Sequence, residues 1–124
     1  VVNSLSAFPQ LRHLEITSCY MVQGADITPL RFSSALQTLD IRFTVSSPDI
    51  TNLSPLTHCL ALTELDISRT QITDLRLLPV CMRLRKLRVT GCRFDTNLEP
   101  LTACSKLQTI RIGGIGITDI EPLR

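Results

Sequence analysis

A short leucine pattern recurs along the whole chain, and it constrains the fold more than any other feature of the sequence. The spacing Leu-x-x-Leu-x-Leu, with Ile or Val at some of the later positions, occurs five times in 124 residues. Successive copies start 25, 26, 22 and 23 residues apart, at Leu11, Leu36, Leu62, Leu84 and Leu107. Periods of about 20 to 50 residues are typical of solenoids, in which each unit buries its apolar side only against its neighbours.

The leucine spacing predicts one short, half-buried strand in each unit. In LTELDIS, for example, Leu65 and Ile67 point to one face and the residues between them point to the other. Parallel neighbours need a crossover, which the roughly fifteen residues left in each unit can supply. A leucine lies six residues before each start, and Pro55, Pro100 and Pro122 stand where a short helical turn can begin.

These features resemble those of leucine-rich repeat proteins over almost the whole chain. The turns TQITDL and IGITDIEPL resemble a short repeat class typified by a protein phosphatase regulator. The cysteine columns resemble F-box substrate receptors, and the blend also resembles repeat proteins of trypanosomatid parasites. One column lies three positions before the first leucine and holds Cys59, Cys81 and Cys104. The other column takes the place of the usual asparagine and holds Cys19 and Cys92.

We therefore expect an α/β leucine-rich repeat solenoid of about five repeats over residues 1–124. Its parallel β-sheet should form the concave face, with short turns or single-turn helices on the convex face. The chain has no initiator Met and no polar cap, so we expect it to be a fragment of a longer solenoid. No unit keeps the usual asparagine, which affects the curvature more than the fold; the column reads Cys19, Thr44, Thr70, Cys92 and Ile115.

The five cysteines are predicted to be small core residues, because they lie in inward-facing columns. Cysteines spread through the stack do not favour a disulfide framework, although one pair between Cys59 and Cys81 stays open. There is no Cys-x-x-Cys motif, and His13 and His58 are far apart in register, so we expect no metal and no cofactor. The consequence is a reducing, intracellular compartment, the cytoplasm.

Catalytic groups are not apparent in the sequence. No column pairs a serine or cysteine with a histidine, so we expect no enzyme activity. Gly113, Gly114 and Gly116 lack the spacing of a phosphate loop and are expected to leave the last strand open to close approach. A net charge of +2 gives no general attraction to nucleic acid or membranes, and no apolar window approaches the roughly 18 residues of a membrane helix.

The basic run MRLRKLRVTGCR, residues 82–93, has two faces once the strand alternation is applied. Leu84 and Leu87 are core residues, while Lys86 and Arg88 point outward. The same alternation gives every unit a middle outward position on the concave face. That column is acidic for three rungs and basic for two, reading Glu15, Asp40, Asp66, Arg88 and Arg111.

We expect this charge gradient to orient a protein partner, because complementary fields set specificity and encounter rate. The other interpretation is a solvated face, with an exposed pair between Asp66 and Arg88 worth less than about 1 kcal/mol. Nucleic acid is disfavoured by the carboxylates on the same surface. The predicted partner-binding residues are His13, Glu15, Asp40, Arg42, Glu64, Asp66, Lys86, Arg88 and Arg111.

The function predicted from the sequence is a protein–protein interaction module, a scaffold or adaptor, which binds neither nucleic acid, nor membrane, nor a small-molecule substrate. Two alternatives stay open. One is the substrate-recognition arm of an F-box-type ubiquitin ligase, although no F-box-like helical segment is present. The other is an architectural subunit of a large assembly. The fold alone does not choose among these functions.

Overall fold

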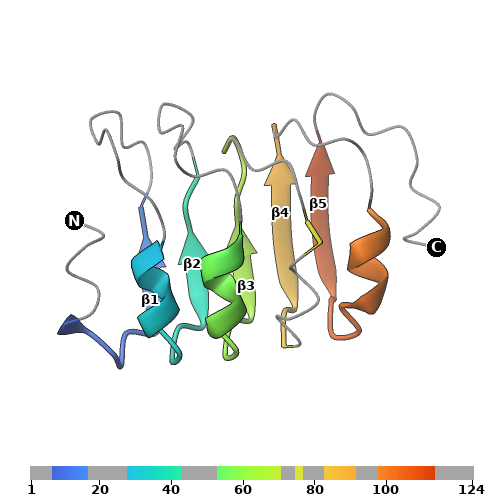
Figure 1. Ribbon diagram of the computed structural model, residues 1–124. Coiled ribbons are helices and arrows are strands. Elements are labelled where there is room, and N and C mark those ends of the chain that lie inside the picture. Colours follow the sequence, from blue (N-terminus) through green and yellow to red (C-terminus); the bar gives the residue numbers. More distant parts are fainter. Residues whose placement is uncertain are drawn as a thin grey trace.

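A computed structural model describes residues 7–16, 28–42, 53–70, 75–76, 83–91 and 98–113. Within these ranges, five short strands form one parallel sheet in chain order, and 3-10 helices lie along one of its faces (Figure 1). The strands are β1 (His13–Glu15), β2 (Thr38–Asp40), β3 (Glu64–Asp66), β4 (Lys86–Thr90) and β5 (Thr109–Gly113). The helices are η2 (Thr28–Phe32), η3 (Ser54–His58) and η5 (Glu99–Ala103).

Each strand pairs with the next in the register that the leucine repeat predicts. The second leucine of one unit lies opposite that of the next, and this column holds Leu14, Leu39, Leu65, Leu87 and Ile110. Because all neighbours are parallel, the chain must return over one face of the sheet before each new strand begins. The expected α/β leucine-rich repeat solenoid, with single-turn helices on its convex side, is confirmed.

The core lies between the sheet and the 3-10 helices. In β4, Leu87 and Val89 are fully buried, while Lys86, Arg88 and Thr90 are exposed, as the alternation predicts. On the convex side, the leucines six residues before each repeat start are buried in the core; the structure describes Leu30, Leu56 and Leu101 of this column. A second convex column, nine residues before each start, is equally buried and was not predicted from the sequence; it holds Leu53, Leu75 and Leu98.

Two proline-initiated helical turns are confirmed. Pro55 and Pro100 lie in the first turns of η3 and η5, where the missing amide donor has no cost. In each turn a threonine hydroxyl, that of Thr57 or Thr102, donates back to the carbonyl three residues earlier, at 2.8 and 2.7 Å. The turn expected at Pro122 lies outside the described residues. No helix in the described segments is long and apolar enough to cross a membrane.

The column three residues before each repeat start packs inside the stack. Cys59 and Cys104 are buried there, and the Cys59 Sγ donates to the Leu30 carbonyl at 3.4 Å. The prediction of core cysteines is confirmed for these two. Ser33 occupies the same column in the second unit, where it is fully buried and its Oγ has no hydrogen-bond partner among the residues that the structure describes. Three other cysteines lie outside the described residues: Cys19, Cys81 and Cys92.

The chain leaves β3 and β4 through a left-handed residue at the same repeat position, Arg69 with φ 55° and Gly91 with φ 71°. The Arg69 amide donates to the Thr90 carbonyl at 2.8 Å, so this turn extends the pairing between units. A Cβ on Gly91 would come within 2.9 Å of the Arg69 Cγ. The next residue after Arg69, Thr70, stands in the asparagine column and donates its hydroxyl to the Ile67 carbonyl at 2.8 Å.

Candidate binding site on the concave face

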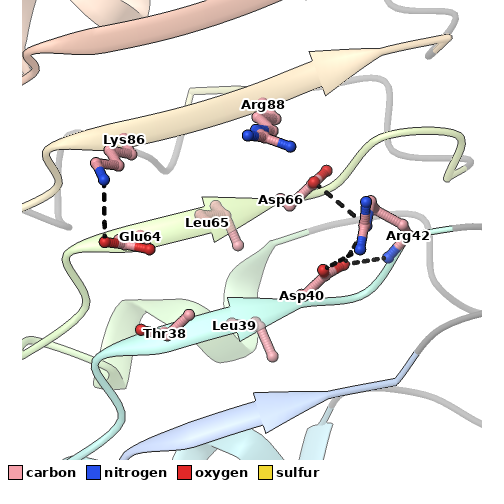
Figure 2. A pocket seen from close by; sticks show the side chains of 9 residues that line it. All are labelled: Thr38, Leu39, Asp40, Arg42, Glu64, Leu65, Asp66, Lys86 and Arg88. Atoms are coloured by element: carbon pink, nitrogen blue, oxygen red, sulfur yellow. Dashed lines mark hydrogen bonds and ion pairs between the residues drawn. The ribbon is translucent and has the colours of Figure 1, made fainter.

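The concave face, which is the face of the sheet opposite the 3-10 helices, carries a hollow of about 200 Å³ over β2, β3 and β4 (Figure 2). Leu39 and Leu65 are almost fully buried and form its floor. The other residues that line the hollow are polar or charged: Thr38, Asp40, Arg42, Glu64, Asp66, Lys86 and Arg88.

The structure brings most of the predicted binding residues together. Asp40, Arg42, Glu64, Asp66, Lys86 and Arg88 all line the hollow. His13 and Glu15 lie on β1, beyond its acidic side, and Arg111 lies on β5, beyond its basic side. The strand register also aligns the middle column as expected, in the order Glu15, Asp40, Asp66, Arg88 and Arg111.

The Arg42 guanidinium links the aspartates of two neighbouring strands, and we call these three residues the Arg42 bridge. Its Nε donates to Asp40 Oδ1 at 2.9 Å, and its Nη2 lies 2.9 Å from Asp40 Oδ2. The same Nε lies 3.4 Å from Asp66 Oδ2 on the next strand. The hydrogen bond and the charge of Asp40 raise the pKa of Arg42, so the guanidinium stays charged.

Both aspartates also hold the backbone at the end of their strands. Asp40 Oδ1 accepts the Arg42 amide at 3.1 Å, and Asp66 Oδ1 accepts the Ser68 amide at 2.9 Å. An aspartate that accepts the amide two residues later closes a local turn. Asp66 is only 8% exposed, although its position points outward. These carboxylates therefore support the strand ends as well as the surface.

The exposed pair between Asp66 and Arg88, which belonged to the alternative interpretation of a solvated face, is wrong. Asp66 pairs with Arg42 instead, and the Arg88 guanidinium makes no hydrogen bond or ion pair in the described part of the chain (Figure 2). Lys86 Nζ lies 3.6 Å from Glu64 Oε1, but the two side chains are 59% and 47% exposed, so this contact contributes little stability. The two aspartates are thus paired with Arg42, whereas Arg88 and Arg111 have no such counter-charge among the described residues.

Two details of the site were missed by the sequence interpretation. Thr38 lines the hollow but was not among the predicted binding residues. Arg42 was predicted as a binding residue, not as the partner of two carboxylates. A signal for the Arg42 bridge exists, because Arg42 follows Asp40 by two residues and residues so spaced in a strand share a face.

The chemical groups on this surface can form ion pairs and hydrogen bonds with charged groups. Its donors are the guanidinium and ammonium groups of Arg42, Lys86, Arg88 and Arg111, and its acceptors are carboxylates. Among the described residues, no three His, Cys, Asp or Glu side chains gather closely enough to hold a metal ion.

The fold and this face define a leucine-rich repeat protein, a class that uses extended concave surfaces to bind other proteins. An internalin (inlF) from Listeria monocytogenes superposes with a TM-score of 0.80 and 20% identity, over 99% of this chain and 34% of that one. Internalin C2 of the same species superposes with a TM-score of 0.77 and 27% identity, over 99% and 51%.

The chain thus spans about a third to a half of these two solved proteins. No protein-family model matches the sequence, and no curated protein does. The internalin likeness supports the leucine-rich repeat fold. The resemblances to more specific classes, those of phosphatase regulators, F-box receptors and trypanosomatid proteins, stay predictions.

Proposed function

We propose that this protein is a protein–protein interaction module, a scaffold or adaptor without catalysis of its own, which binds a protein partner on its concave face. The observation that carries the proposal is the hollow over β2, β3 and β4. Three neighbouring strands contribute charged side chains to one surface, and the sheet fixes their relative positions.

A surface of this kind is suited to a partner with matching charges. Paired strands lie about 4.8 Å apart, so the backbone positions that carry these side chains are already set before a partner binds. The Arg42 bridge orders part of the surface in advance. Charged groups arranged in this way give specificity and rapid encounter rather than affinity alone.

The partner that we propose is another protein. Asp40, Glu64 and Asp66 line the hollow, and their carboxylates would repel a nucleic acid or an anionic membrane. The buried free thiol of Cys104 favours the reducing interior of a cell, where we propose that the protein works.

Two bulky substitutions of matched size test the proposal. Thr38→Trp fills the hollow, and Ala103→Trp adds the same side chain to an exposed position of η5 on the convex side. Each variant and the unchanged protein are used as bait in native extract, and the retained proteins are quantified by mass spectrometry. We expect at least one protein to be retained by the unchanged bait and by Ala103→Trp, and to fall at least tenfold with Thr38→Trp.

Thermal unfolding of the three baits is the control for folding, and surface substitutions of this kind should change stability by only about 0.5 kcal/mol. Equal retention by both variants would contradict binding on the concave face. Ubiquitin-ligase components among the lost proteins would favour the F-box alternative, and subunits of one stable assembly would favour an architectural role.

A further inference from the structure

Two arginines face each other at the basic end of the concave face. Arg88 of β4 lies directly opposite Arg111 of β5 in the parallel register. Both side chains are exposed, and neighbouring strands are about 4.8 Å apart. Like charges directly opposite each other in a sheet are destabilising. Neither guanidinium makes a hydrogen bond or ion pair with any residue that the structure describes, so the repulsion is not offset within these ranges.

At the acidic end of the same face, the like charges have a counter-charge between them. Asp40 and Asp66 also lie directly opposite each other, but Arg42 stands between them, at 2.9 and 3.4 Å. Like charges are thus adjacent at three places in this column, Glu15 opposite Asp40, Asp40 opposite Asp66 and Arg88 opposite Arg111. Among the described residues, the arginine pair is the one of the three without a counter-charge beside it. The arginine pair is therefore the place on this face where an opposite charge from outside would have the greatest effect.

We propose that Arg88 and Arg111 form a recognition site for an acidic segment of the protein partner, with carboxylate side chains bound by the two guanidinium groups. This inference rests on the proposed function and names the chemistry of the partner. Guanidinium groups offer planar, forked donors that match a carboxylate, and such charge-assisted bonds are stronger than neutral ones. Two bound carboxylates would also remove the repulsion between the arginines.

The positions two residues before and two residues after the arginines in β4 and β5 leave room for a peptide. On one side Thr90 lies opposite Gly113, and a Cβ built on Gly113 would meet only the Thr90 Cγ2, at 3.8 Å. On the other side Thr109 lies opposite Lys86. Thr90 and Thr109 are exposed, so their hydroxyls can donate to peptide carbonyls next to the bound carboxylates.

The shape of the charge pattern favours a short acidic peptide over a polyanion. Strand β3 is paired with β4 on the side away from β5, and its Glu64 and Asp66 lie on the same face. A nucleic acid crossing the face would place phosphates against these carboxylates, whereas a peptide can be acidic over β4 and β5 and change composition beyond them.

The test is fluorescence anisotropy with defined probes. One labelled peptide alternates Glu and Gly, a second replaces Glu with Lys, a third carries phosphoserine in place of Glu, and a single-stranded oligonucleotide has the same charge as the first. We expect the Glu peptide to bind at low salt and to weaken as salt rises. Arg88→Gln with Arg111→Gln should reduce its affinity at least tenfold, while the Lys peptide should not bind.

A matched double variant, Arg83→Gln with Arg85→Gln, removes the same charge from exposed positions before β4. It should keep most of the affinity, since the pair itself and not the net charge is the site. Equal weakening by the two double variants would overturn the inference, as would binding of the phosphopeptide or oligonucleotide in preference to the Glu peptide. If Thr38→Trp releases the partner but the Arg88 and Arg111 variant does not, the proposed function stands and this inference fails.

Discussion

Replacing Ser33 with alanine should stabilise the protein, although Ser33 is fully buried in the core. Its hydroxyl makes no hydrogen bond within the described part of the chain, whereas its backbone amide donates to the Leu30 carbonyl and its carbonyl accepts the Leu36 amide. Removing the hydroxyl therefore breaks no bond. A buried hydroxyl without a partner costs about 1 to 3 kcal/mol, and Ser33→Ala removes that cost.

The void left behind offsets only a small part of the gain. A void of about 15 Å³, at about 24 cal/mol per Å³, costs ~0.4 kcal/mol. We therefore expect the free energy of unfolding to rise by about 0.5 to 2.5 kcal/mol. Ser33→Cys introduces the residue type that Cys59 and Cys104 have in the same column, and it should also stabilise the protein.

The assay is equilibrium unfolding in urea, with Thr70→Val as the control. Thr70 is as deeply placed, at 4% exposure, but its hydroxyl donates to the Ile67 carbonyl at 2.8 Å. Loss of the Thr70 hydroxyl should destabilise the protein by about 1 kcal/mol, because its hydrogen bond to the Ile67 carbonyl is lost. A fall in stability for Ser33→Ala comparable to that of Thr70→Val would refute the reasoning, since it would mean that the Ser33 hydroxyl has a partner.

Three further changes have a direction that the structure fixes. Gly91→Ala should destabilise by about 1 to 2 kcal/mol in urea unfolding, because φ is 71° and a Cβ would lie 2.9 Å from the Arg69 Cγ; Gly113→Ala, with only a 3.8 Å contact, should change little. Arg42→Gln should leave the two aspartates of the Arg42 bridge facing each other and lower stability more at low salt than at high salt; equal loss at both salt concentrations would contradict this. Burial raises the pKa of the Cys104 thiol above its ordinary 9.0, so the unfolded chain ionises first and stability should fall as the pH rises above 9.0; Cys104→Ala should show a smaller fall in the same titration.

The strands and the core were predictable because the packing requirement is itself periodic. Each unit buries its leucines only against the next unit, so Leu65 or Leu87 identifies its strand without knowledge of distant contacts. The same logic could have found Leu53, Leu75 and Leu98, whose nine-residue offset repeats as regularly as the predicted columns.

The site was predictable in position but not in its internal contacts. Strand alternation alone places Asp40, Asp66 and Arg88 on one face. It does not say which carboxylate a long side chain reaches, because this depends on the rotamer of Arg42 and on its distance from two strands at once. Asp66 is also more buried than its outward position implies, since Arg42 and the turn at Ser68 engage its two oxygens.

The in-register pairing of the strands makes the surface charge pattern separable from the fold. Excision of one whole unit, residues 62–83, would bring Leu84 to the place that Leu62 now occupies, so that the leucine columns stay in phase. The same cut would place Asp40 directly opposite Arg88 and remove the carboxylate rung between them. Gain or loss of single units can thus redraw the electrostatic map of such a coil in one step, with its hydrophobic interior retained, a route to new partners that point substitutions would take several steps to reach.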